Sequence, residues 1–282
     1  MRWSHWHVTA LAVLATLCPT GRVSAQTTPE TDAVKLELEV DALATLNDLQ
    51  LSWAQVAALR VLASDTAAKV DQSPAPADAD YQAALREARL AILSRNDDRI
   101  DQAQDKLATL GQKRDADSEP DIDNTDAAKA KAPGFLKSLA ASQVAHYLAQ
   151  NAEDVEDPGE ILVDALHQCR NLSDADFEVL RDDTADEIGL LASGVNPAKP
   201  PLVIQKAARF LTRCRGLSAQ EYQAQKATLE DEARKMVEID PITCLRHWME
   251  GELADLLSNP QLQTALKDWE SSSKNAANKP DQ

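Results

Sequence analysis

A five-residue pattern recurs along the chain, in which Leu-Ser is followed, three residues after the Ser, by Gln, Asp or Glu. The strict copies are Leu51–Gln55, Leu172–Asp176, Leu217–Glu221 and Leu257–Gln261, and a looser copy is Leu139–Gln143. In such a pattern the Ser accepts a hydrogen bond from the backbone N–H three residues on, and the polar residue there bonds back to the Ser N–H. The Leu is placed for the hydrophobic staple. Each copy therefore predicts the start of a helix.

The composition also favours helix over strand. The chain has 8 Gly among 282 residues and only 4% aromatic residues, which leaves few aromatic runs for strands. We therefore predict an all-α fold. Apolar residues at helical spacing mark these segments: 31–46, 52–70, 78–110 as one long helix or a helical pair, 135–150, 160–169, 174–191, 202–214, 219–237 and 242–257.

Two copies of the pattern belong to a longer repeat. Cys169-Arg170-Asn171-Leu172-Ser173, followed by Phe177, is echoed 45 residues later by Cys214-Arg215-Gly216-Leu217-Ser218, followed by Tyr222. A helix, a tight turn and a second helix in one period are typical of stacked helical hairpins, each too small to bury its own apolar stripe. We expect a repeat-like array of helical hairpins in the C-terminal half.

The domain organisation follows from these segments. We predict an N-terminal helical hairpin region over residues 26–114, an acidic loop over 115–132 and a C-terminal hairpin array over 133–270. The tail, residues 271–282, has no apolar pattern and is expected to be disordered.

The N-terminus predicts export. Arg2 precedes an apolar run from Val8 to Cys18, and Val23-Ser24-Ala25 has the small-residue spacing of a signal-peptidase site. The run is shorter than the roughly 20 residues that a spanning helix needs. Residues 1–25 are therefore predicted to be a cleaved signal peptide, and the mature chain a periplasmic or secreted protein with no integral membrane segment.

The charge limits the classes of partner. The formal net charge is -17, and loss of Arg2 and Arg22 with the signal peptide makes it -19. Such a surface repels phosphate backbones and anionic lipids, so nucleic acid is not expected as a partner.

A resemblance rests on two copies of the pattern. Leu51-Ser52-Trp53-Ala54-Gln55 and Leu257-Ser258-Asn259-Pro260-Gln261 resemble the motif of the LTXXQ family of periplasmic helical proteins, the Spy and CpxP type. The resemblance covers five residues at each site. It implies an envelope-stress, chaperone or metal-response role.

The usual catalytic signatures do not occur in the sequence. It contains no GxSxG elbow, HExxH, phosphate-binding glycine loop or CxxC. We therefore expect a non-enzymatic interaction, scaffold or chaperone-like module that holds a protein or peptide partner in the cell envelope. The sequence does not indicate the oligomeric state.

The alternative function is metal binding, and its first candidate site is acidic. Positions 1, 3, 5, 7, 9 and 12 of an EF-hand-like loop are occupied by Asp115, Asp117, Glu119, Asp121, Asp123 and Asp126. Position 6 is Pro120, whose φ is fixed negative where the loop needs the positive φ that Gly supplies. A solvated acidic linker is therefore the competing interpretation of a Ca²⁺ site.

The remaining candidates involve sulfur. Cys244 lies three residues before His247 on one helical face and is a candidate Zn²⁺ ligand pair. Cys169 and Cys214 occupy equivalent positions of the repeat, which makes them candidates for a disulfide in an oxidising compartment. The alternative is that the three mature cysteines are buried thiols.

Overall fold

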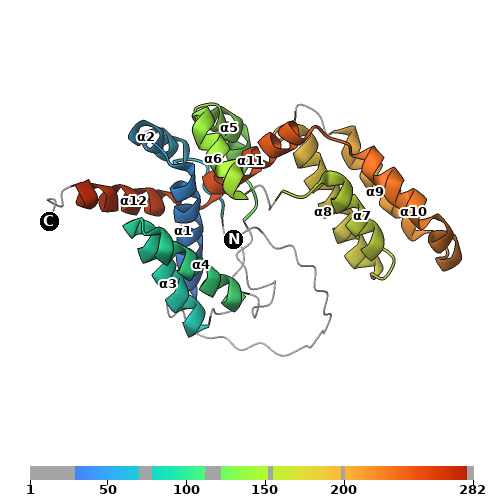
Figure 1. Cartoon of the computed structure of the whole chain (residues 1–282), viewed down its shortest axis with the longest axis horizontal. Helices are drawn as coiled ribbons and strands as arrows, with labels where there is room; N and C mark the ends of the chain where they lie inside the picture. Colours follow the sequence, from blue (N-terminus) through green and yellow to red (C-terminus); the bar gives the residue numbers. More distant parts are fainter. Residues whose placement is uncertain (1–28, 70–77, 112–121, 152–154, 198–200, 278–282) are drawn as a thin grey trace. The chain divides into compact units, whose positions relative to one another are not determined.

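The computed structural model describes residues 29–69, 78–111, 122–151, 155–197 and 201–277 (Figure 1). These residues form twelve α-helices and no strand, which confirms the all-α prediction. The predicted signal peptide, residues 1–25, lies outside the described residues. Two compact units divide the chain: residues up to Thr125 together with those from Asp255 onward, and residues Asp126–Ala254.

The first unit contains five complete helices: α1 (Pro29–Leu49), α2 (Trp53–Leu62), α3 (Ala79–Ser94), α4 (Asp97–Gly111) and α12 (Leu262–Ala277). Helix α3 packs against α1 and α4, and α12 packs against α1. The segment 78–110 is a helical pair, because Arg95 adopts the left-handed conformation with φ 52° and ends α3. Asp78 caps the start of α3, because its side chain accepts a hydrogen bond from the Asp80 N–H at 2.9 Å.

A partly buried arginine joins three helices of the first unit. The Arg89 Nε on α3 lies 2.6 Å from Glu39 Oε1 on α1, and its Nη2 contacts Asp268 Oδ2 on α12. Each of the three side chains is 30% exposed or less. Screening by water is therefore reduced, and the network holds the three helices in one register.

The fourth copy of the Leu-Ser pattern does not start a helix, so the prediction for it was wrong. Ser258 is the last residue of α11 (Pro241–Ser258), and α12 begins four residues later at Leu262. The Ser258 hydroxyl donates to Asn124 Oδ1 at 3.0 Å and accepts from the Thr125 N–H at 3.1 Å. These tertiary hydrogen bonds use the hydroxyl that would otherwise cap a helix.

The second unit contains α5 (Asp126–Leu136), α6 (Ala141–Asn151), α7 (Pro158–Gln168), α8 (Asp174–Ser193), α9 (Leu202–Arg215), α10 (Ala219–Met236) and most of α11. Helices α7 and α8 form one hairpin, and α9 and α10 form the second (Figure 1). Helix α8 also packs against α9, and α10 against α7, so the four helices close around a shared core. That core includes Leu162, Leu166, Phe177, Ile188, Phe210, Leu211, Tyr222 and Leu229.

The 45-residue repeat corresponds to these two hairpins, and equivalent arginines connect them. Arg170 Nη1 donates to the Leu217 carbonyl at 2.7 Å, and Arg215 Nη2 donates to the Leu172 carbonyl at 3.1 Å. The guanidinium of Arg170 lies 4.8 Å from the centre of the Tyr222 ring. Each hairpin therefore supplies a cation to the turn of the other.

The capping predictions hold at the other strict copies. Ser52 and Ser218 each form a complete capping box, with Gln55 and Glu221 respectively. Ser173 caps α8 by accepting from the Asp176 N–H at 3.2 Å. At the looser copy, Gln143 Oε1 accepts from the Ala140 N–H at 2.9 Å.

Three predicted boundaries are wrong. Residues 126–132, expected in the acidic loop, are helical, because α5 buries Ala128, Ala132 and Phe135 along one stripe and continues through Pro133. Residues 271–277 of the expected tail are the last part of α12. The C-terminal residues from Asp255 belong to the first unit, because α12 packs against α1.

Candidate functional site

Helix α9 differs in charge from the chain around it. Its 14 residues include no Asp or Glu but carry four cations, Lys206, Arg209, Arg213 and Arg215, in a chain of formal charge -17. The buried side chains of α9 are Ala207, Phe210, Leu211 and Cys214. Because these residues repeat at helical spacing, Lys206, Arg209 and Arg213 lie on the opposite, exposed face.

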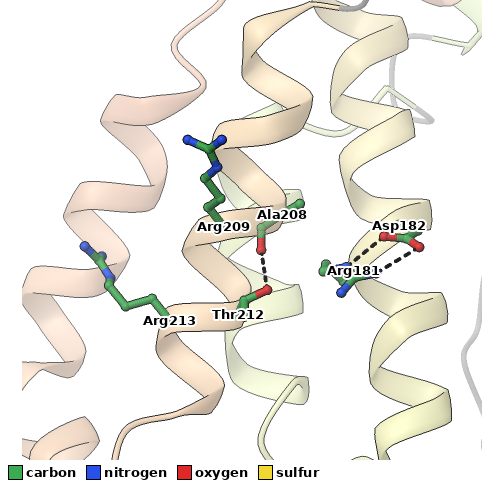
Figure 2. A pocket seen from close by; sticks show the side chains of 6 residues that line it. All are labelled: Arg181, Asp182, Ala208, Arg209, Thr212 and Arg213. Carbon is green, nitrogen blue, oxygen red and sulfur yellow. Dashed lines mark hydrogen bonds and ion pairs between the residues drawn. The ribbon is translucent and has the colours of Figure 1, made fainter.

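A hollow of about 540 Å³ lies between α8 and α9 in the second unit. It is open to solvent and is lined by Arg181, Asp182, Ala208, Arg209, Thr212 and Arg213 (Figure 2). Three of these six residues are arginines, contributed by both helices. We refer to this hollow as the arginine groove.

Two helices approach closely beside the groove because one residue lacks a side chain. A Cβ atom at Gly189 on α8 would lie 2.5 Å from Cδ1 of Ile204 on α9. A contact that short is not tolerated between carbon atoms, so glycine permits the close packing here. One or two turns further along, Asp182 and Thr212 face the same hollow.

Arg181 is held by the residue that follows it. Its Nε lies 2.7 Å from Asp182 Oδ1, and its Nη2 lies 3.0 Å from Asp182 Oδ2 (Figure 2). This bidentate pair lowers the pKa of the Asp182 carboxyl below its ordinary value. The Arg181 guanidinium also lies 5.8 Å from the centre of the Phe177 ring. Arg181 is thus a positioned cation at the α8 side of the groove.

Arg213 is held from the other direction. Its Nη2 lies 2.6 Å from Glu232 Oε2 on α10, and its guanidinium lies 5.2 Å from the centre of the Phe210 ring. The hydrogen bond to Glu232 raises the pKa of Arg213 further. Both partners are at least one third exposed, so the pair orients Arg213 more than it stabilises the fold.

Arg209 lies one turn from Arg213 on α9 and lines the same groove. Its side chain is exposed, and it makes no hydrogen bond or ion pair with any residue that the structure describes. Thr212 Oγ1 donates to the Ala208 carbonyl at 2.8 Å, which leaves its oxygen lone pairs available to accept (Figure 2). The groove therefore combines one uncompensated guanidinium with two oriented ones.

Guanidinium groups arranged in this way bind oxyanions. Each presents planar N–H donors that match the two oxygens of a carboxylate, and arginine carries its charge at any physiological pH. The groove lining contains no histidine, cysteine or serine. Recognition of carboxylates on a partner is the chemistry that this arrangement supports.

The predicted cysteine sites are buried in the core of the second unit. Cys169, Cys214 and Cys244 are all free thiols, and Cys169 and Cys214 are fully buried. Burial raises the pKa of Cys169 to about 11, and the nearby Cys214 adds to this effect. Cys169 and Cys214 are reduced thiols in this structure. A disulfide between them under oxidising conditions stays a prediction.

The predicted zinc pair is not brought together with further ligands. Cys244 belongs to the hydrophobic core, and His247 Nδ1 lies 2.9 Å from the Leu191 carbonyl at the end of α8. Within the described residues, no group of three or more His, Cys, Asp or Glu is placed to hold a metal ion. Zinc binding by Cys244 and His247 stays a prediction.

The predicted calcium site lies mostly outside the described residues. Asp115, Asp117, Glu119 and Asp121 are not described, whereas Asp123 is exposed and Asp126 is the first residue of α5. The two residues between them, Asn124 and Thr125, are hydrogen-bonded to Asp255 and Ser258. Their polar groups therefore fix the chain before α5.

The arginine groove was not predicted from the sequence. Its signal was present as a stretch from Leu202 to Arg215 without a single acid, in a chain where acids outnumber bases 46 to 29. Apolar spacing alone predicts only an amphipathic helix for this stretch. A count of charge per helix identifies it.

The fold and the site define a class: an all-α protein with a closed four-helix arrangement and a cationic groove on a strongly acidic chain. No helix among the described residues is both long enough and apolar enough to cross a membrane. No protein-family model, curated protein or solved structure matches the chain. The resemblance to the LTXXQ family therefore stays a prediction.

Proposed function

We propose that this protein is an exported, non-enzymatic helical module that holds a protein or peptide partner of the cell envelope, as a scaffold or chaperone-like component. The observation that carries the proposal is the arginine groove. Arg181 and Arg213 are oriented by ion pairs, and the Arg209 side chain in the same groove has no ion-pair partner among the described residues. The partner presents carboxylates to these guanidinium groups.

The net charge of the chain does not prevent such binding. At physiological ionic strength, exposed charges are screened beyond about 8 Å, so local charges determine the potential that a ligand meets in the groove. These are three guanidinium groups against the carboxylates of Asp182 and Glu232, which leaves Arg209 uncompensated. The acidic remainder of the surface opposes non-specific binding of other anions. The combination favours a partner whose acidic groups are concentrated on one segment.

The test is binding of a short fluorescent oligoglutamate to residues 26–282, measured by anisotropy. We expect saturable binding that Arg209→Glu weakens at least tenfold, which corresponds to about 1.4 kcal/mol. The matched control is Arg99→Glu, because Arg99 is exposed on α4 of the first unit and the substitution changes the net charge equally. Binding should also weaken as salt is raised.

Two results would contradict the proposal. One is the absence of oligoglutamate binding at low salt, and the other is an equal loss of binding in the Arg209 and Arg99 variants. If binding is localised to the groove, a photo-crosslinking residue at Thr212 identifies the partner in the envelope. The same residue at Thr228, which is exposed on α10 of the same unit, is the control.

A further inference from the structure

We infer that the partner of the arginine groove is a second copy of this chain, bound through a symmetric pairing of the adjacent helices α8 and α9. The inference rests on the proposed function, because it names the protein that the same surface binds. It is carried by a second observation, the distribution of acids on α8. The arginine groove alone does not distinguish one acidic partner from another.

Helix α8, which lines the groove, carries an acidic surface. Its 20 residues contain seven acids and one arginine. Glu178, Asp182 and Asp186 are all exposed and are spaced by four residues, so they form one stripe along the helix. We call these three residues the acidic stripe.

The matching cations lie on the adjacent helix. Lys206, Arg209 and Arg213 on α9 are all exposed and are spaced by three and four residues. We call these three residues the basic stripe. The two stripes meet in the arginine groove, which is lined by Asp182 of the acidic stripe and by Arg209 and Arg213 of the basic stripe (Figure 2). The stripes therefore lie at the same level along α8 and α9.

The acidic stripe on α8 and the basic stripe on the neighbouring α9 make the surface of this helix pair complementary to a second copy of itself. A two-fold axis that runs along the groove places α8 of each copy over α9 of the other. Because the axis keeps every residue at its own level, Asp182 of one copy faces Arg209 and Arg213 of the other. Asp186, one turn along, faces Lys206 and Arg209. This is the isologous arrangement that most homodimers use.

The charges close to the groove favour this pairing, because each copy places its basic stripe against the acidic stripe of the other. Arg209 and Lys206 make no ion pair with any described residue of their own copy, so pairing with the other copy breaks no interaction of theirs. The net charge of -19 on each copy of residues 26–282 opposes the approach, and this repulsion is weakened by salt.

The test is sedimentation velocity of residues 26–282 over a range of concentrations. We expect a reversible dimer, and we expect Arg209→Glu and Asp186→Lys each to weaken it at least tenfold. In either variant, both contacts of the symmetric dimer place like charges together. An equimolar mixture of the two variants should restore a dimer, because the carboxylate introduced at position 209 of one copy then faces the ammonium introduced at position 186 of the other.

The matched controls are Arg99→Glu and Asp101→Lys, both at exposed positions on α4 of the first unit. They change the net charge by the same amounts and should leave the dimer intact. Three results would each overturn the inference. The chain could stay monomeric, the dimer could survive both Arg209→Glu and Asp186→Lys, or the mixture of the two variants could fail to form the heterodimer. A monomer that still binds oligoglutamate through Arg209 would overturn the dimer while supporting the proposed function.

Discussion

Arg170 and Arg215, which lie 45 residues apart in the sequence, donate hydrogen bonds to the turns of each other's hairpins. Arg170 Nη1 contacts the Leu217 carbonyl at 2.7 Å and the Cys214 carbonyl at 3.3 Å. Arg215 Nη1 contacts the Cys169 carbonyl at 2.9 Å. These carbonyls lie at the ends of α7 and α9 and in the turns that follow, so each arginine adds hydrogen bonds to backbone acceptors of the opposite hairpin.

The first prediction concerns this exchange. Arg170→Gln and Arg215→Gln should each lower the free energy of unfolding by about 1–3 kcal/mol, because each removes charge-assisted hydrogen bonds to partly buried carbonyls. Urea unfolding followed by circular dichroism measures the change. Arg86→Gln, at an exposed position on α3 of the first unit, is the control and should alter stability by less than about 0.5 kcal/mol. Equal stability of all three variants would show that the exchanged bonds contribute nothing.

The second prediction concerns the network around Arg89. Arg89→Met should destabilise the protein by about 2–4 kcal/mol, because it leaves the carboxylates of Glu39 and Asp268 partly buried without their cation. Lys106→Met is the comparison, since the Lys106–Glu87 pair is about half exposed and should be worth little. Thermal unfolding of the two variants should therefore differ by several degrees. Similar melting temperatures would argue that the Arg89 network is compensated by solvent.

Local helix starts were predictable from the sequence because the atoms of a cap are adjacent in the chain. Ser52 and Ser218 bond residues three positions away, so no tertiary information is needed. Ser258 carries the same local pattern, but Asn124 and Thr125 approach it from more than a hundred residues away. Tertiary hydrogen bonds of this kind override a local signal, which is why the fourth copy was predicted wrongly.

The repeat was predictable, whereas the groove between its helices was not. The Cys-Arg echo at Cys169 and Cys214 identified the hairpins, because equivalent residues occupy equivalent places. Which helices face each other is decided by the core, and only that packing brings Arg181 beside Arg209. The metal and disulfide predictions depended on distances of the same long-range kind.

The third prediction concerns the capping box of α10. Ser218→Ala should lower the free energy of unfolding by about 1 kcal/mol, because it removes the acceptor for the Glu221 N–H at the start of the helix. Thr228→Ala, at an exposed position within the same helix, should have a much smaller effect. Chemical denaturation distinguishes the two. A larger loss at Thr228 than at Ser218 would contradict a role for the cap.

The fourth prediction concerns metal ions. Excess Ca²⁺ or Zn²⁺, added to residues 26–282 after treatment with a chelator, should not raise the melting temperature. A metal that bound only the folded state would raise it by mass action. For zinc, the reason is that Cys244 is buried in the hydrophobic core and that the described residues bring no group of three ligands together. For calcium, the reason is Pro120 at the turn position. A rise of several degrees with Ca²⁺ that Asp126→Asn abolishes would instead favour the metal-binding alternative.

The fifth prediction follows from the raised pKa of Cys169. The folded protein keeps this thiol protonated up to a pKa of about 11, whereas the ordinary value is 9.0. Between these values the unfolded chain has lost the proton and the folded chain retains it. The stability contributed by the neutral thiol is therefore present below pH 9 and is lost as pH rises toward 11.

The slope measures this effect without reference to absolute stability. For one thiol it approaches about 1.4 kcal/mol per pH unit between the two pKa values. Cys169→Ala lacks this contribution, so its unfolding free energy should fall less steeply over that interval than that of the unsubstituted protein, even if the smaller side chain destabilises it at neutral pH. Parallel curves for the two proteins would contradict a buried thiol at this position. Parallel curves would also be expected if Cys169 formed a disulfide with Cys214. A count of free thiols after denaturation separates the two cases, because the reduced protein has three and the disulfide form has one.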